Sequence, residues 1–226
     1  MIYAISGFIF GLLIPYISRR FEKFMPATGG YAIYRIVKPT KKVSTTKKKS
    51  RDKYKKLAKS YLWRSIVWGI FCGALSYLTA FNYGEVNAIW YVGFFWSLLL
   101  LAEIDYRMML LPDRITFPLL IAGFLYAVFV GQWVGVGESA IGAAYGYIIP
   151  VFASMLFVWK NKDVFGGGDI KLLAAVGAWV GLEKLAYVIV FSTILFMIYA
   201  LVKKKRGGAY GPAIAVATIA VAFCFL

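Results

Sequence analysis

Apolar residues occur in eight long runs that are separated by short polar stretches. The runs cover residues 2–18, 62–81, 86–104, 115–133, 139–159, 170–182, 185–202 and 209–226. A helix needs about 20 apolar residues to cross a bilayer, and most of the runs approach that length. The run at 170–182 is short, so we expect it to be tilted, buried in protein or joined to the next run. The pattern predicts an all-α, polytopic integral membrane protein with about eight transmembrane or partly embedded helices.

The first run is followed at once by Arg19 and Arg20, whereas the charges of a secretory signal precede its apolar stretch. We therefore expect residues 1–18 to form a first transmembrane helix. Residues 19–64 then contain 16 lysines and arginines against two acidic residues. Apolar side chains recur among these lysines at helical spacing, at Tyr54, Leu57, Ala58, Tyr61 and Leu62. This predicts a helix that lies on anionic lipids and then turns into the membrane. Because basic loops beside membranes are common, we expect no nucleic-acid partner.

The composition agrees with a membrane protein and excludes several kinds of catalysis. Hydrophobic residues make up 61% of the chain, against about 45–50% in soluble domains. The chain has no histidine, which excludes Ser-His-Asp and Cys-His catalysis and most catalytic zinc sites. The two cysteines, Cys72 and Cys224, lie inside apolar runs without a CxxC partner, so we expect them to be packing residues.

The positions of the 26 basic residues predict an orientation in the membrane. If the 19–61 loop is cytoplasmic, the connections at 105–114, 160–171 and 203–208 are cytoplasmic as well. Lys184 is then the single basic residue in an outside connection. Such an asymmetry is typical of the positive-inside rule, and it places both termini outside.

In this topology two aspartates lie at the cytoplasmic ends of apolar runs. Asp169 follows three glycines at the start of one run, and Asp105 ends another run 64 residues earlier. An aspartate after glycines can simply be a helix N-cap, which is the alternative for Asp169. Two neighbouring carboxylates, however, do not both ionise readily, so one can activate a water while the other donates a proton to a carbonyl oxygen. The pair indicates aspartyl-protease chemistry, which requires no metal.

The stretch Phe165-Gly-Gly-Gly-Asp-Ile-Lys-Leu-Leu, together with Asp105 and Pro112-Asp113, closely resembles the two motifs of the GxGD-type prepilin peptidases. The resemblance implies a bacterial inner-membrane aspartyl endopeptidase that removes short basic leaders from type IV prepilins or pseudopilins. It implies a cut after a glycine, on the cytoplasmic side. The matching catalytic residues are Asp105 and Asp169. The residues expected to shape the site are Gly166, Gly167, Gly168, Pro112 and Asp113. Residues 62–226 would then form the membrane-embedded peptidase domain, after the basic loop at 19–61.

The basic loop departs from the family because it lacks the paired CxxC motifs that many members carry there. S-adenosylmethionine would be needed only if methyl transfer were retained, and we expect an unmethylated product and no metal. Lys171 could tune the protonation of Asp169, bind substrate, or simply anchor the chain at the membrane surface. Asp113 is expected to be an N-cap rather than a catalyst. Two alternatives are an inactive component of a pilus or secretion machine and an ion-coupled transporter.

Overall fold

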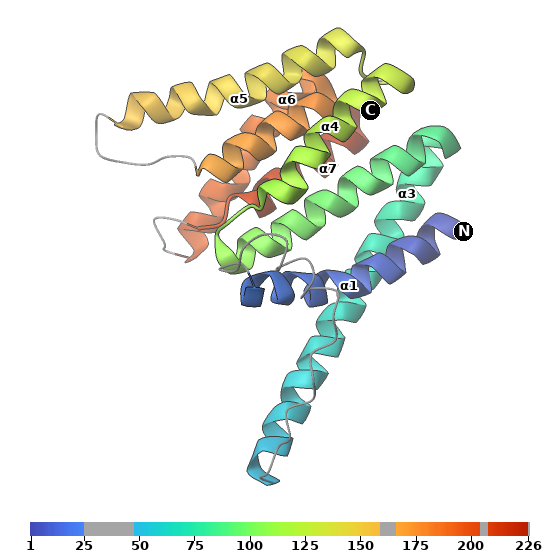
Figure 1. The fold of residues 1–226 in the computed structure, drawn as a ribbon, viewed down its shortest axis with the longest axis vertical. Helices are drawn as coiled ribbons and strands as arrows, with labels where there is room; N and C mark the ends of the chain where they lie inside the picture. The colour runs from blue at the N-terminus through green and yellow to red at the C-terminus, as the bar shows by residue number, and fades with distance from the viewer. Residues whose placement is uncertain (25–47, 159–165, 204–207, 226) are drawn as a thin grey trace. The chain divides into compact units, whose positions relative to one another are not determined.

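The computed structural model describes residues 1–24, 48–158, 166–203 and 208–225, with only the backbone described at 22–24, 48–60, 85 and 157–158. These residues are almost entirely α-helical, which confirms the predicted all-α class (Figure 1). The helices are α1 (Ile2–Phe24), α3 (Lys48–Met108), α4 (Asp113–Phe129), α5 (Val136–Val158), α6 (Gly167–Lys203) and α7 (Gly211–Phe225).

The described residues form fewer helical elements than the roughly eight that were predicted, because two pairs of apolar runs are joined; for the run at 170–182 this joining was one of the expected arrangements. The runs at 62–81 and 86–104 both belong to α3, and those at 170–182 and 185–202 both belong to α6. Each of these long helices is interrupted by one glycine with non-helical angles, Gly84 (φ 72°, ψ 166°) and Gly181 (φ 76°, ψ 174°). Glycine adopts such positive φ values without steric cost, so the chain reverses direction there within one helical element (Figure 1).

Several helices have the length and apolar character of membrane spans. Within the described residues five stretches qualify, namely Ile2–Phe21, Tyr61–Gly84, Val86–Met108, Val136–Leu156 and Gly167–Lys203. The run at 115–133 forms a helix that ends at Phe129, and α7 has 15 residues, so both are shorter than the roughly 20 residues of a full span.

The basic segment is described only at its two ends. The helix α1 continues past Ser18 to Phe24, and the segment that was expected to form a surface helix is helical, as the start of α3. The expected turn at residue 62 is absent, since α3 is helical from Lys48 up to Gly84. The rest of the predicted loop, residues 25–47, lies outside the described residues.

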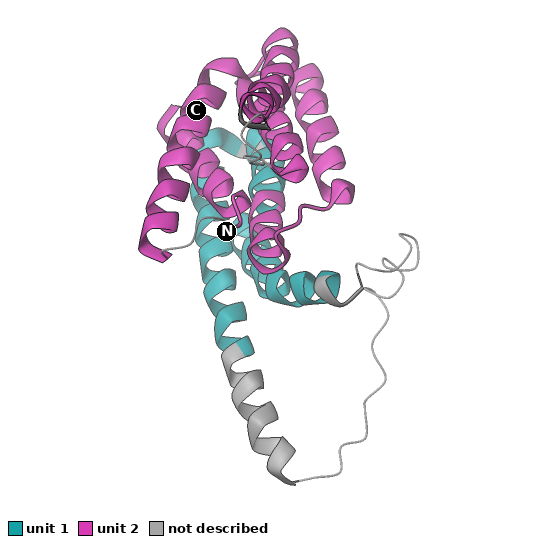
Figure 2. Cartoon of the chain, turned by 90° about the vertical axis from the view of Figure 1, so that its left-hand side faces the viewer, with its two compact units in different colours: residues 1–96 teal, residues 97–226 magenta. Residues whose placement is uncertain are grey.

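The chain divides into two compact units, Met1–Trp96 and Ser97–Leu226, and the division falls inside α3 (Figure 2). In unit 1, α1 packs tightly on α3 because Gly7 faces Ser76 and Gly11 faces the backbone of Trp68. Small residues at such positions allow two helix backbones to approach closely. Trp96 also donates a hydrogen bond from Nε1 to the Ser76 hydroxyl at 2.9 Å, which joins the two arms of α3.

In unit 2, α6 is the central helix and contacts α4, α5 and α7. Its first arm is buried continuously from Leu172 to Gly181. Gly142 on α5 and Gly177 on α6 bring the two backbones into direct contact. Trp179 donates from Nε1 to the Leu119 carbonyl of α4 at 2.8 Å. These contacts fix the position of α6, and Asp169 lies at the beginning of that helix.

Candidate active site

Asp105 lies in the last turn of α3 and is buried, with 4% of its surface exposed. Its Oδ2 atom accepts a hydrogen bond from the backbone amide of Gly211 at 2.8 Å. The helix ends one turn later, where Met109 adopts a left-handed conformation (φ 51°) that is unusual for a residue with a side chain. The carboxylate is thus enclosed at the end of a helix and held there by one amide of another helix.

Gly211 is the first residue of α7, and the sequence did not identify it as a site residue. The Tyr210 carbonyl accepts hydrogen bonds from the amides of Ala213 (3.0 Å) and Ile214 (3.1 Å), so Tyr210 caps the helix and Gly211 begins it. Amides in the first turn of a helix have no partner within the helix and attract negative charge. A methyl group at Gly211 would lie 2.8 Å from Asp105 Oδ2, so the close approach requires glycine. The one local signal was the Gly211-Pro212 pair near the beginning of the final apolar run.

Asp169 lies in the first turn of α6. The Gly166 carbonyl accepts hydrogen bonds from the amides of Asp169 (3.0 Å) and Ile170 (3.3 Å), so Gly166 is the N-cap and Asp169 the third helical residue. The Asp169 carboxylate in turn accepts a hydrogen bond from the Gly166 amide. The reading of Asp169 as an N-cap is therefore wrong. Its carboxylate reaches back to the cap, as the third residue of a capping box does.

Two contacts bring the start of α6 to the segment that follows α3. Gly168 faces Leu111 so closely that a methyl group there would lie 2.9 Å from Leu111 Cβ. Lys171 forms an ion pair with Asp113. As a result, Asp105 and Asp169 are near enough for their negative charges to repel each other. The structure therefore brings together the two aspartates that the sequence singled out.

Lys171 and Asp113 are engaged with each other rather than with Asp169. The Lys171 Nζ atom lies 2.8 Å and 2.7 Å from the two carboxylate oxygens of Asp113. The side chains are 38% and 51% exposed, so water reaches this pair. The expected N-cap at Asp113 is wrong by one residue, because Pro112 occupies the cap with extended angles (φ −73°, ψ 123°) and Asp113 begins α4. Asp113, the third aspartate of the two motifs, is thus paired with Lys171 at a partly exposed position.

The three glycines before Asp169 differ in whether a side chain would fit at their positions. A methyl group at Gly166 would lie 3.1 Å from Asp169 Oδ2, and one at Gly168 would meet Leu111. A methyl group at Gly167 would meet nothing within 4 Å. Gly166 and Gly168 therefore have a steric role at this site, whereas Gly167 has open space around it.

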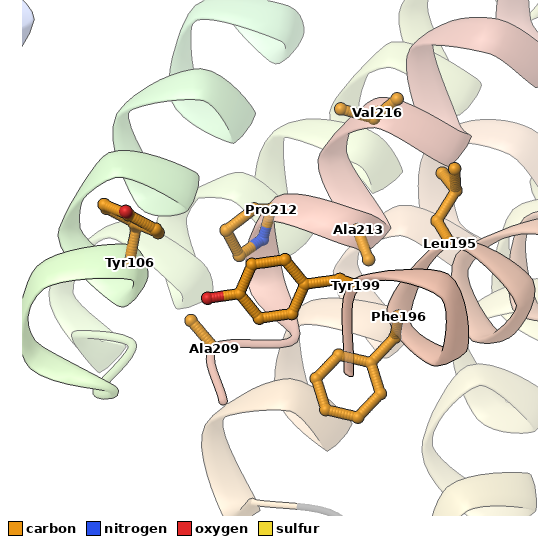
Figure 3. Close-up of a pocket in the computed structure, with 8 residues that line it drawn as sticks. All are labelled: Tyr106, Leu195, Phe196, Tyr199, Ala209, Pro212, Ala213 and Val216. Atoms are coloured by element: carbon orange, nitrogen blue, oxygen red, sulfur yellow. The ribbon is translucent and has the colours of Figure 1, made fainter. Parts of the chain in front are cut away.

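An apolar pocket of about 200 Å³ is bordered by the residues that follow Asp105 and Gly211 in the chain (Figure 3). It is lined by residues of α3, α6 and α7 and of the segment before α7, namely Tyr106, Leu195, Phe196, Tyr199, Ala209, Pro212, Ala213 and Val216. Tyr106 follows Asp105 in the chain, and Pro212 follows Gly211. The hydroxyl end of Tyr199 points toward the side where Tyr106 lies (Figure 3). An apolar group in this pocket would therefore lie next to the residue that follows the buried carboxylate.

The arrangement contains the groups that acid–base catalysis requires. One carboxylate of a close pair can accept a proton while the other donates one. Within the described residues, no three His, Cys, Asp or Glu side chains are grouped as a metal site would need.

Comparison with known proteins gives the same result as the motifs. Residues 92–201 match the model of the Type IV leader peptidase family. Proteins named "Prepilin leader peptidase/N-methyltransferase" are similar to this chain in several bacteria. The relative from Dichelobacter nodosus is 36% identical over 159 residues, which are 68% of this chain and 55% of that protein. The relative from Escherichia coli (strain K12) is 32% identical over 151 residues, or 65% of each chain. The relative from Pseudomonas putida is 38% identical over 126 residues, or 55% of this chain and 43% of that protein.

The chain thus covers less than two thirds of each of these relatives. No solved structure matches it. The matched region contains both aspartates, all three glycines and the Pro112-Asp113 pair. Over residues 92–201, the chain is thus similar to the type IV leader peptidase family.

Proposed function

We propose that this protein is an aspartyl endopeptidase of the bacterial inner membrane that removes short basic leader peptides from type IV prepilins or pseudopilins. Asp105 and Asp169 are its catalytic residues, and the bond cleaved follows a glycine on the cytoplasmic side. The observation that supports this proposal is the pairing of two carboxylates, each of which accepts a hydrogen bond from a glycine amide at the start of a helix. The proposal explains why one buried carboxylate and one half-buried carboxylate lie close together at helix ends.

In this mechanism the ionised carboxylate of the pair takes a proton from a bound water. The water oxygen attacks the scissile carbonyl carbon, and the protonated carboxyl donates its proton to the carbonyl oxygen. Collapse of this tetrahedral intermediate breaks the carbon–nitrogen bond, and the departing amine takes a proton from the pair. The amides of Gly211 and Gly166 hold the two carboxylates in place throughout. Neither a metal nor S-adenosylmethionine takes part in these steps.

Methyl transfer is a separate activity that appears in the names of the relatives. The loop at 19–61 lacks cysteine and histidine, so a metal-bound subdomain of the usual kind has no ligands there. We therefore propose that the new N-terminus leaves this protein unmethylated. The basic charge of that loop fits binding to anionic lipids on the cytoplasmic leaflet.

The test is cleavage of a leader-bearing pilin precursor by the protein in membranes, with mass spectrometry of the product. Asp105→Asn and Asp169→Asn should each lower the cleavage rate by about 10²–10⁴-fold, because half of an acid–base pair cannot complete the reaction. Asp113→Asn is the matched control. It makes the same chemical change at a nearby carboxylate that is bound to Lys171, and it should retain most of the activity.

Full activity of Asp105→Asn or Asp169→Asn, in protein that inserts normally, would end the aspartyl-protease assignment. Cleavage that is lost equally in Asp113→Asn would show that the pair as assigned is incomplete. A methyl group on the product that depends on this protein would overturn the proposal of an unmethylated N-terminus and leave the peptidase assignment standing.

A further inference from the structure

Tyr210 connects the start of α7 to α6 through its side chain. It immediately precedes Gly211, and its carbonyl accepts the first two amide hydrogen bonds of α7. Its ring is buried, with 7% exposed, and meets the ring of Phe196 edge-on at 5.3 Å between centroids. Its hydroxyl lies 2.7 Å from the Ser192 hydroxyl, which is fully buried. One residue thus caps α7 with its backbone and reaches α6 with its side chain.

The hydroxyl groups around Tyr210 form a defined network. The Ser192 hydroxyl donates to the Ile189 carbonyl at 3.1 Å, and the Thr193 hydroxyl donates to the same carbonyl at 2.7 Å. Each hydroxyl has one proton, so these two residues have committed theirs to α6 itself. Tyr210 is then the donor to Ser192, and its oxygen also lies 3.3 Å from Thr193. The network fixes the Tyr210 hydroxyl against one turn of α6.

The position of that hydroxyl matters because the next residue holds Asp105. The Gly211 amide reaches Asp105 Oδ2 at 2.8 Å, and a single methyl group would not fit between them. A shift of the first turn of α7 would therefore lengthen this hydrogen bond or press the backbone into the carboxylate. We propose that Tyr210 is a positioning residue, whose hydrogen bond to Ser192 sets the first turn of α7 and so places the Gly211 amide on Asp105.

This inference rests on the proposed peptidase function, since it assigns Asp105 a part in the reaction. Tyr210 touches neither the water nor the scissile bond and acts through Gly211. Misplacing a catalytic group by about 1 Å costs on the order of 10²-fold in rate. We therefore expect Tyr210→Phe to lower kcat by about 10-fold to 100-fold and to leave KM nearly unchanged.

A double variant separates positioning from simple stabilisation. Tyr210→Phe removes the hydrogen bond that the buried Ser192 oxygen receives from Tyr210, which should lower Tm by about 2–4 °C. Adding Ser192→Ala removes the Ser192 hydroxyl as well, and replacing both members of a buried hydrogen bond is nearly neutral for stability. The double variant should therefore recover most of the Tm, whereas its kcat stays low because the hydrogen bond between position 210 and Ser192 is still missing. Recovery of kcat together with Tm would overturn the proposal.

Tyr187→Phe is the matched control. It makes the same change on α6, the helix that the Tyr210 side chain reaches, at a ring that is 41% exposed and stacks on Phe225 at 4.8 Å. It should leave kcat, KM and Tm unchanged.

Hydrogen exchange of the Gly211 amide supplies a readout that is independent of cleavage. Exchange measured by NMR on glycine-labelled protein should be faster in Tyr210→Phe than in Tyr187→Phe. Unchanged exchange at Gly211 would refute the positioning role even if cleavage were slower. If instead the exchange changes as expected but Asp105→Asn remains active, the peptidase proposal fails and the structural coupling of Tyr210 to Gly211 stands.

Discussion

Replacing Gly211 by alanine tests the contact between α7 and Asp105 most directly. The new methyl group would lie 2.8 Å from Asp105 Oδ2 and 3.1 Å from Asp105 Cβ. Ordinary contacts of a Cβ atom begin at 3.4 Å, so the two helices must separate by roughly 0.6 Å. The amide hydrogen bond, now 2.8 Å, would then lengthen toward the limit of about 3.2 Å for a good N–H···O bond.

The expected effects on activity and on stability differ in size. Forcing an extra methyl group into a packed site costs about 1–3 kcal/mol, while alanine gains about 0.8–1.0 kcal/mol over glycine in a helix. The free energy of unfolding should therefore fall by only about 0–2 kcal/mol. If Asp105 is catalytic as proposed, its displacement by a good fraction of an ångström should lower the cleavage rate far more, by about 10²-fold.

Gly167→Ala is the matched control, because Gly167 is also the first residue of a helix and a methyl group there meets nothing within 4 Å. Cleavage of a pilin precursor and thermal unfolding would be measured for both variants in the same membranes or detergent. Gly211→Ala should lose activity while it remains folded, and Gly167→Ala should keep its activity and be slightly more stable. Equal activity of the two variants would refute the conclusion that the Gly211 contact matters for the reaction.

Three further predictions concern the rim of the site, the topology and the chemistry. Lys171→Ala should lower the free energy of unfolding by about 0.2–1 kcal/mol, and by less at high salt, because its ion pair with Asp113 is largely exposed. A double-variant cycle with Asp113→Ala measures the coupling energy of the pair, and a value near zero would show that the pair contributes nothing to stability. The predicted topology can be tested with single cysteines after both native cysteines are replaced. A cysteine at Glu138 should react with an impermeant thiol reagent in intact cells and one at Lys203 should not, as the positive-inside orientation requires. The reverse labelling would overturn that orientation. Strong chelators should leave cleavage unchanged, since in the proposed mechanism the carboxylate pair supplies both acid and base. Activity lost to a chelator and restored by zinc would contradict this.

The sequence alone determined the class of the protein and the chemistry available to it. Apolar runs of near-span length, few charges and one basic loop dictate a polytopic helical membrane protein, because each signal depends on local composition. The absence of histidine excludes Ser-His-Asp and Cys-His catalysis and most catalytic zinc sites. The glycine run before Asp169 marks one half of the candidate site. The pairing with Asp105 followed from charge asymmetry, which predicts that the end of one run and the start of the other lie on the same side of the membrane.

Only the tertiary structure showed which groups hold those carboxylates. The bond from Gly211 to Asp105 joins residues 106 positions apart, and the pair of Lys171 with Asp113 joins residues 58 apart. Such contacts depend on how α6 and α7 pack, which no local pattern encodes. Lys171, two residues after Asp169 in a helix, points to a different neighbour, because successive helical side chains face different directions. The helix count differed because one glycine with positive φ, Gly84 or Gly181, reverses the chain while the polar residues around it stay helical.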